Sequence, residues 1–215
     1  MRSAWLGACL ALAACGDPLT EGDWRGTPAM VIRGGTVPLP PEAAADLELA
    51  LVWAPLADAE AAAPPDGATF PVVAGDVASD RDFGAFELAL HDAPPESVRG
   101  AEGELSVALL TVLAVPGALP DAVSGATRGE LARGVSDDHY VVWARDAAAA
   151  RAAGTPAILN PIALADGYNL AVGVCRPGRP SQLLVVPPER VSIIAVAEAK
   201  AGDCLDVFWG AWRAH

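Results

Sequence analysis

The stretch Leu105-Ser106-Val107-Ala108-Leu109-Leu110-Thr111-Val112-Leu113-Ala114-Val115 is the longest apolar run after the first fourteen residues of the chain. Apolar side chains occupy both alternating sets of positions, which is typical of a central β-strand that is covered on both faces. Pro116 and Gly117 end the run. The sequence therefore predicts a strand at the centre of the fold over residues 105–115.

Shorter segments on both sides of this run also have strand patterns. In residues 46–53 a large apolar side chain occupies every second position, which indicates a half-buried strand. A helix beginning at Glu42 is the alternative, and both Pro55 and the strict alternation count against it. The other expected strands cover residues 29–37, 69–74, 86–90, 139–144, 168–175, 182–186, 191–197 and 205–209.

One short helix is expected near residues 146–153, because Asp146 is a typical N-cap residue, alanines follow it, and Gly154 ends the run. About ten strands with turns rich in proline and glycine predict an all-β fold, an antiparallel β-sandwich with this one helix. The Gly- and Pro-rich stretch 116–134 is the candidate boundary. It separates a β-sandwich region, 29–115, from a second β-rich region, 123–215, and the two could also pack as one domain.

The N-terminus has the features of a secretory signal peptide. Arg2 precedes an apolar run over residues 4–14 that is too short to cross a bilayer as a helix. The run ends in Leu12-Ala13-Ala14-Cys15, which resembles the lipobox of bacterial lipoproteins. This resemblance implies that residues 1–14 are removed and that Cys15 is lipidated. An ordinary signal peptide with an incidental cysteine is the alternative.

The lipobox resemblance also implies how the protein is placed. Residues 15–28 would tether the body to the membrane, and two or three acyl chains suffice for stable attachment. No later stretch offers about eighteen uninterrupted apolar residues, so the body is not expected to span the membrane. In enterobacterial lipoproteins an Asp directly after the lipidated Cys retains the protein in the inner membrane. Gly16 holds that position here, which favours the outer membrane.

The charge of the chain restricts its partners. The formal net charge is −13, and residues 17–124 hold 18 acidic residues against four arginines. Such a chain is not expected to bind nucleic acid electrostatically. The acidic half is either a solvated face that keeps the protein soluble or a surface for a cationic or divalent-metal partner.

The stretch Phe83-Gly84-Ala85-Phe86-Glu87-Leu88-Ala89-Leu90 resembles the G-x-F-x-L-x-L segment of transthyretin-like, carboxypeptidase-regulatory-type β-sandwich modules. The resemblance covers at most residues 28–115. It implies a seven-stranded sandwich that supports binding or assembly and performs no chemistry itself.

Candidate catalytic residues are few. Ser124 lies in Val-Ser-Gly-Ala, without the glycines of a G-x-S-x-G nucleophile elbow, and is interpreted as a turn serine. Asp137, Asp138 and His139 offer three ligand types in a row, but adjacent residues of a strand point to opposite faces. They are more simply explained as a solvated strand start.

Metal sites and cofactors have little support in the sequence. Asp76, Asp80 and Asp82 are spaced so that a turn could gather hard oxygen ligands for Ca²⁺, although the Gly and final Glu of an EF-hand loop are missing. His91 and Asp92 at a strand end, and His215 at the terminus, have no ligand spacing to a neighbour. No cofactor is expected.

Two cysteines remain after processing, because Cys9 leaves with the signal peptide and Cys15 takes the lipid. In an oxidising compartment these two, Cys175 and Cys204, are expected to form a disulfide. Two separate buried thiols are the alternative.

Three functions fit these observations. The first is a membrane-anchored lipoprotein that acts as a non-enzymatic binding or assembly module for an envelope protein or glycan. The second is an envelope hydrolase whose residues, drawn from Ser124, Asp137, Asp138 and His139, converge only in three dimensions. The third is a purely structural envelope component.

Overall fold

The computed structural model describes residues 26–39, 46–55, 69–79, 84–99, 104–153, 159–160, 164–174 and 182–196. This part of the chain is mainly β-structure with three short helices, as the predicted mainly-β fold requires. Cys15, Cys175, Cys204, Asp80 and Asp82 lie outside the described residues, as do His215 and the predicted strand 205–209.

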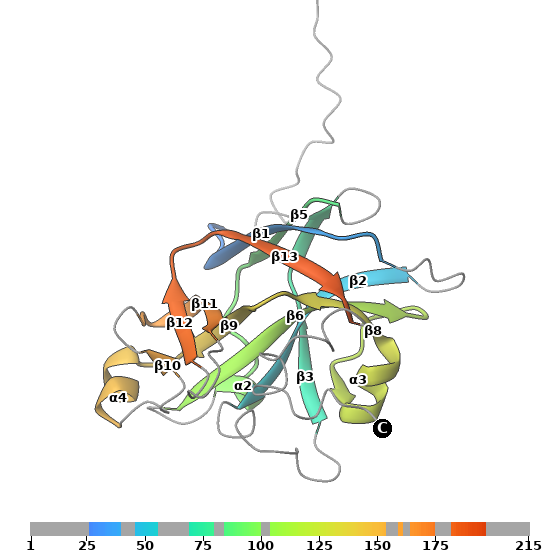
Figure 1. Cartoon of the computed structure of the whole chain (residues 1–215). Helices are drawn as coiled ribbons and strands as arrows, with labels where there is room; N and C mark the ends of the chain where they lie inside the picture. Colours follow the sequence, from blue (N-terminus) through green and yellow to red (C-terminus); the bar gives the residue numbers. More distant parts are fainter. Residues whose placement is uncertain are drawn as a thin grey trace, which may run out of the picture.

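The elements follow one another along the chain as in Figure 1. In order they are β1 (Met30–Thr36), β2 (Asp46–Pro55), β3 (Thr69–Ala74), β4 (Asp76–Ser79), β5 (Phe86–Leu90), α2 (Glu96–Arg99), β6 (Leu105–Val115), β7 (Ala122–Ser124), α3 (Gly125–Leu131), β8 (Ala132–Ser136), β9 (His139–Ala144), α4 (Ala147–Ala152), β10 (Leu159–Asn160), β11 (Gly167–Val174), β12 (Gln182–Val186) and β13 (Arg190–Ala195).

Strand β6 lies at the centre of the fold, and every one of its residues is buried. It pairs antiparallel with β2 along one edge. Its odd-numbered side chains join one hydrophobic core cluster and its even-numbered side chains join another. The prediction of a central strand covered on both faces is therefore confirmed, because apolar residues at both alternating sets of positions require a layer on each side.

The second edge of β6 pairs with two strands in succession. Thr111 is in register with Val135 of β8, and Ala108 is in register with Val141 of β9. Only Leu109 and Leu110 separate these pairings on β6, whereas residues 136–140 separate them on the other side. The sheet divides at residues 136–140, because β8 pairs onward with β13 while β9 pairs onward with β11.

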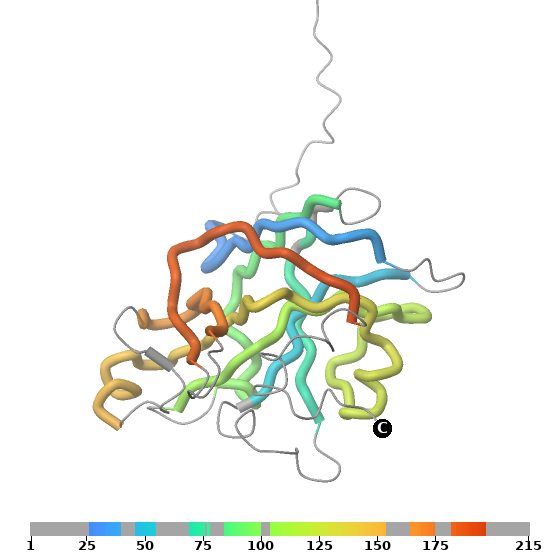
Figure 2. The backbone as a smooth tube through the Cα atoms, viewed as in Figure 1, coloured from blue at the N-terminus to red at the C-terminus, as the bar shows by residue number. Residues whose placement is uncertain are grey.

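The branch that begins with β8 and β13 forms a second layer, which covers one face of β2, β6 and β9. Its order is β8-β13-β1-β5-β4, and Figure 2 shows β1 and β13 running side by side. The chain enters this layer directly, since only Gly75 separates β3, which pairs with β2, from β4, which pairs with β5. The inner core cluster between the layers includes Trp53, Leu88 and Leu110.

The pairing is not purely antiparallel, because β1 pairs with β13 and β10 pairs with β12 in parallel. A residue pattern with period two reports which side of a strand is buried and does not report the direction of its neighbour. Strands of both predicted regions share the sheet, for β1 pairs with β13 and β6 with β8 and β9.

The predicted helix near residues 146–153 is α4, and its N-cap is Asp146, whose carboxylate accepts a hydrogen bond from the amide of Ala149 at 2.8 Å. The segment 116–134, expected as a boundary, contains β7, α3 and the start of β8. Helix α3 was not predicted from the sequence, because two of its seven residues, Gly125 and Gly129, have low helix propensity. Among the described helices, none is long and apolar enough to cross a bilayer.

Candidate functional site

Ser124 is the N-cap residue of α3 and does not face a catalytic base in the described structure. Its hydroxyl accepts a hydrogen bond from the amide of Thr127 at 3.1 Å and donates one to the Thr127 hydroxyl at 2.9 Å. These two contacts satisfy the first turn of the helix, which is the usual task of a serine at this position. The interpretation of Ser124 as a turn residue agrees with this geometry.

Asp137 and Asp138 form the turn between β8 and β9. Asp138 has a φ of 55°, a conformation that aspartate tolerates better than most residues. The turn is fixed by backbone hydrogen bonds from the Asp137 amide to the Ser192 carbonyl and from the Gly173 amide to the Asp138 carbonyl. Burial raises the pKa of the Asp138 carboxyl, and the neighbouring Asp137 charge raises it further, against the opposing effect of His139.

Both ring nitrogens of His139 have hydrogen-bond partners within the fold. One ring nitrogen, Nδ1, lies 2.9 Å from the Asp137 carbonyl oxygen, and the other, Nε2, lies 3.1 Å from a carboxylate oxygen of Glu189. The hollow beside His139, which Leu110 and Leu170 help to line, has no room for a water molecule. Within the described residues Ser124 and His139 have different hydrogen-bond partners and make no hydrogen bond to each other.

The candidate calcium ligands are only partly described. Asp76 lies in β4, and Asp80 and Asp82 lie outside the described residues, so the proposed turn stays a prediction. In the part of the chain that the structure describes, no three His, Cys, Asp or Glu residues gather as they would around a metal ion.

A pocket of about 230 Å³ opens between β3, the end of β5, the segment before α2 and β11. Its walls are mostly small or apolar, and its polar groups come from a histidine, an aspartate and a tyrosine. The lining residues are Val73, Ala74, Gly75, Ala89, Leu90, His91, Asp92, Ala93, Pro95 and Tyr168. A concave site with apolar walls and a few polar groups is the usual form of a small-ligand site.

Gly75 is required where the pocket wall turns from β3 into β4. A Cβ atom at this position would lie 2.6 Å from the Ala89 carbonyl oxygen and 2.7 Å from the Leu88 side chain. Only glycine therefore lets the two strands approach this closely. The close approach sets the distance between β3 and the end of β5, which form two sides of the pocket.

Three aromatic rings support the Tyr168 side of the pocket. Register places Trp143 between Ser106 of β6 and Tyr168 of β11. Ser106 and Ala108 are small, so the Tyr168 ring can approach Trp53 of β2, with 6.2 Å between ring centroids. Trp143 meets the Tyr168 ring edge-on at 4.8 Å. These contacts fix the orientation of Tyr168 by packing.

Asp92 and Tyr168 provide the polar end of the pocket. The Tyr168 hydroxyl donates a hydrogen bond to the Asp92 carbonyl oxygen at 2.8 Å. Burial raises the pKa of Tyr168 to about 12, the Asp92 charge raises it further, and Arg99 acts in the opposite direction. Within the described residues no hydrogen bond or ion pair engages the Asp92 carboxylate.

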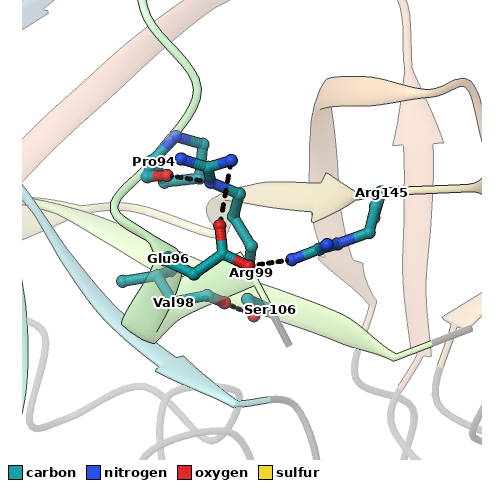
Figure 3. Close-up of polar contacts among 6 residues, drawn as sticks. All are labelled: Pro94, Glu96, Val98, Arg99, Ser106 and Arg145. Atoms are coloured by element: carbon teal, nitrogen blue, oxygen red, sulfur yellow. Dashed lines mark hydrogen bonds and ion pairs between the residues drawn. The ribbon is translucent and has the colours of Figure 1, made fainter. Parts of the chain in front are cut away.

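A polar cluster around α2 fixes the chain beside the pocket, as Figure 3 shows. Arg99 donates to the Pro94 carbonyl oxygen at 2.6 Å and pairs with Glu96 at 3.1 Å, and Arg145 pairs with the same Glu96 carboxylate at 2.6 Å. The hydrogen bond and charge of Arg145, followed by the charge of Arg99, lower the pKa of Glu96. Beneath the helix, the buried Ser106 hydroxyl donates to the Val98 carbonyl oxygen.

Sequence reasoning noticed His91 and Asp92 only as residues at a strand end, and it missed Gly75 and Tyr168. The residues of the pocket come from segments far apart in the chain, and no local spacing joins them. Two signals in the sequence point toward it: the glycine that follows the strand pattern 69–74 at Gly75, and the prolines that end the pattern 86–90 at Pro94 and Pro95.

Comparison with protein-family models, with curated proteins and with solved structures returned no match to this chain, so the lipoprotein and transthyretin-like resemblances stay predictions and the pocket is interpreted from its own chemistry.

Proposed function

We propose that this protein is a lipid-anchored component of the bacterial cell envelope, at the outer membrane, whose β-sheet body binds a small ligand or an exposed group of a partner without transforming it. The observation that carries the binding role is the pocket between β3, β5 and β11, with Asp92 and Tyr168 among its polar lining residues. The anchor rests on the lipobox-like residues that end at Cys15.

The geometry favours binding over hydrolysis. The hydroxyl of Ser124 caps α3, and the turn of Asp137 and Asp138 closes β8 against β9. Both features serve the fold, and neither lies among the residues that line the pocket. The pocket itself has walls built from packed strands, which provide the rigid support that a binding site needs.

The anchor is tested with radiolabelled palmitate and envelope fractionation. Only a thiol at position 15 can be acylated in this scheme, so Cys15→Ser is expected to lose the label and to leave the membrane fraction. Cys9→Ser is the matched control, since it removes a signal-peptide thiol and leaves the lipobox intact. Equal labelling of wild type and Cys15→Ser would overturn the anchor.

The binding role is tested by photo-crosslinking in intact cells. A photoreactive amino acid replaces Ala93, an exposed residue of the pocket, and in a matched variant it replaces Ala126, an exposed residue of α3 outside the pocket. We expect a light-dependent adduct from position 93 that is absent from position 126. Identical adducts from both positions, or none from position 93, would argue against binding at the pocket.

A further inference from the structure

We propose that the pocket binds an organic cation, a primary ammonium group carried on a short apolar chain. This inference rests on the proposed function and adds the chemical class of the ligand. Its support comes from the shape of the pocket, its hydrogen-bonding groups and the charges around it.

The shape suits one narrow group. A volume of about 230 Å³ accommodates a short chain or a single side group, and it is too small for a helix or a folded segment. Val73, Ala74, Ala89 and Leu90 provide apolar walls that suit methylene groups. The ligand is therefore expected to be apolar along its length.

The polar end offers hydrogen-bond acceptors. The Tyr168 hydroxyl uses its proton toward the Asp92 carbonyl oxygen, so its lone pairs remain as acceptors. The Asp92 carboxylate is an acceptor without a partner among the described residues. An ammonium group brings three donors and no acceptor, so it matches this set. The Tyr168 ring adds attraction for a cation near its face.

The charges near the pocket favour a cation as well. Among the described residues, the lining holds His91, Asp92 and Tyr168, and beside it lie Arg99 and Glu96, the latter paired also with Arg145. Arg99 shares the Glu96 carboxylate with Arg145 and lies outside the lining, whereas Asp92 belongs to the lining. The raised pKa of Tyr168 agrees, since Asp92 affects it more than Arg99 does.

The net charge of the whole chain also favours a cationic ligand. A formal net charge of −13 attracts cations to the surface and speeds their approach at low salt. Nine of the ten lining residues belong to the N-terminal half, in which the acidic excess lies, and Tyr168 is the tenth. An anionic ligand would meet both this field and the Asp92 carboxylate.

The test compares two ligands of equal length with the lipidated full-length protein in a non-ionic detergent. Cadaverine carries ammonium groups, and 1,5-pentanediol is its neutral counterpart. Isothermal titration calorimetry and saturation-transfer NMR are expected to show cadaverine binding at least tenfold more tightly than the diol, a difference of about 1.4 kcal/mol. Raising the salt concentration is expected to weaken cadaverine binding.

Protein variants locate the effect. Asp92→Asn keeps the shape of the pocket and removes its charge, so it is expected to weaken cadaverine binding about tenfold. Asp121→Asn, at an exposed aspartate outside the lining, is the matched control and is expected to bind like wild type. Tyr168→Phe is expected to retain more of the affinity than Tyr168→Leu, because the phenylalanine keeps the ring. Circular dichroism confirms that each variant is folded.

Three results would overturn the inference: no cadaverine binding at about 50 mM, equal binding of cadaverine and diol, or equal weakening by Asp92→Asn and Asp121→Asn. A failure of this kind together with a specific adduct at position 93 would leave the proposed binding role standing and reject only the ammonium ligand. If the photoreactive variant at position 93 yields no adduct in cells while cadaverine binds as expected, the proposed binding role in the envelope is rejected and the ammonium site stands.

Discussion

The hydroxyl of Tyr168 donates a hydrogen bond to the carbonyl oxygen of Asp92, 2.8 Å away, and so links β11 to the chain that follows β5. The bond joins residues 76 positions apart in the sequence. It holds the segment that contains Asp92 against the aromatic cluster of Trp53, Trp143 and Tyr168. The backbone position of Asp92 thus depends on the tyrosine.

The two tyrosines of the chain provide a pH prediction. Burial raises the pKa of Tyr168 to about 12 and raises that of Tyr140 further. The folded protein keeps these protons over a range in which the unfolded chain, with a tyrosine pKa near ~10, loses them. The free energy of unfolding is therefore expected to be highest below about pH 10 and to fall as the pH rises from about 10 toward 12.

Absorbance at about 295 nm, where phenolate absorbs, measures this titration. Tyr140→Phe isolates Tyr168, whose folded-state midpoint should lie near 12 and should move to about 10 in denaturant. A midpoint near 10 in the folded variant would contradict the buried environment of Tyr168.

Asp146 is expected to stabilise α4 through its cap. Asp146→Ala removes the acceptor for the Ala149 amide and should lower the free energy of unfolding by about 1 kcal/mol. Asp146→Asn keeps a side-chain oxygen and should change it by only a few tenths of that amount. Urea unfolding measures both, and equal losses in the two variants would show that the hydrogen bond is not the cause.

Ser106 and Glu96 both make contacts that fix α2, and substitutions at the two positions are expected to differ in their effect on stability. Ser106→Ala leaves the buried Val98 carbonyl oxygen without its donor, so the free energy of unfolding should fall by about 1 kcal/mol. Glu96 is solvent-exposed, and Glu96→Gln should leave stability almost unchanged because exposed ion pairs contribute little. A larger loss in Glu96→Gln than in Ser106→Ala would reverse this assignment.

Two glycine substitutions should change stability in opposite directions. Gly75→Ala places a Cβ 2.6 Å from the Ala89 carbonyl oxygen, so it should destabilise the fold and widen the pocket. Gly125→Ala meets nothing within 4 Å at the start of α3 and should stabilise the protein by up to about 1 kcal/mol. Thermal melting compares the two, and a neutral Gly75→Ala would mean that the chain at position 75 can move away from β5 without cost.

The expected disulfide between Cys175 and Cys204 is tested on exported protein. Cys175 comes directly after Val174, the last residue of β11, in the sequence, and both cysteines lie outside the described residues. A bridge that encloses about 30 residues should add roughly 3.7 kcal/mol by the chain-entropy estimate. Intact-mass analysis after alkylation of the unfolded chain should show no label at these thiols without reduction and two labels with it. Two labels without reduction would refute the bridge.

The strands that could be predicted are those with a clear burial pattern. In β6 both alternating sets of positions are apolar, and the predicted burial on both faces is confirmed. In β2 the strand itself was predicted correctly, but its half-buried character was wrong: the small set, Ala50, Val52 and Ala54, is buried in one core cluster while the large set, Leu49, Leu51 and Trp53, is buried in the other. The helix α4 was predictable because a good N-cap, alanines and a terminating glycine agree at Asp146 and Gly154.

Other features depend on tertiary contacts that leave no local mark. The parallel pairing of β1 with β13 joins segments whose patterns give no direction. Arg128 is fully buried, with its guanidinium carbon 4.7 Å from the centroid of the Phe70 ring, although an arginine in the Gly- and Pro-rich stretch 116–134 looks solvated in sequence. The pocket was missed for the same reason, since Gly75, Asp92 and Tyr168 meet only after the sheet has folded.

The parallel pair of β1 and β13 also constrains how the chain folds in time. The guanidinium of Arg190 reaches the Gly34 carbonyl oxygen across 156 positions of sequence, and this loop closes only when nearly the whole chain is present. Until then, β5 is the strand among the described residues with which β1 can pair. If the chain is exported from its N-terminus, one edge of β1 stays unpaired until β13 has followed. A fold that depends on such long loops is expected to form in milliseconds to seconds.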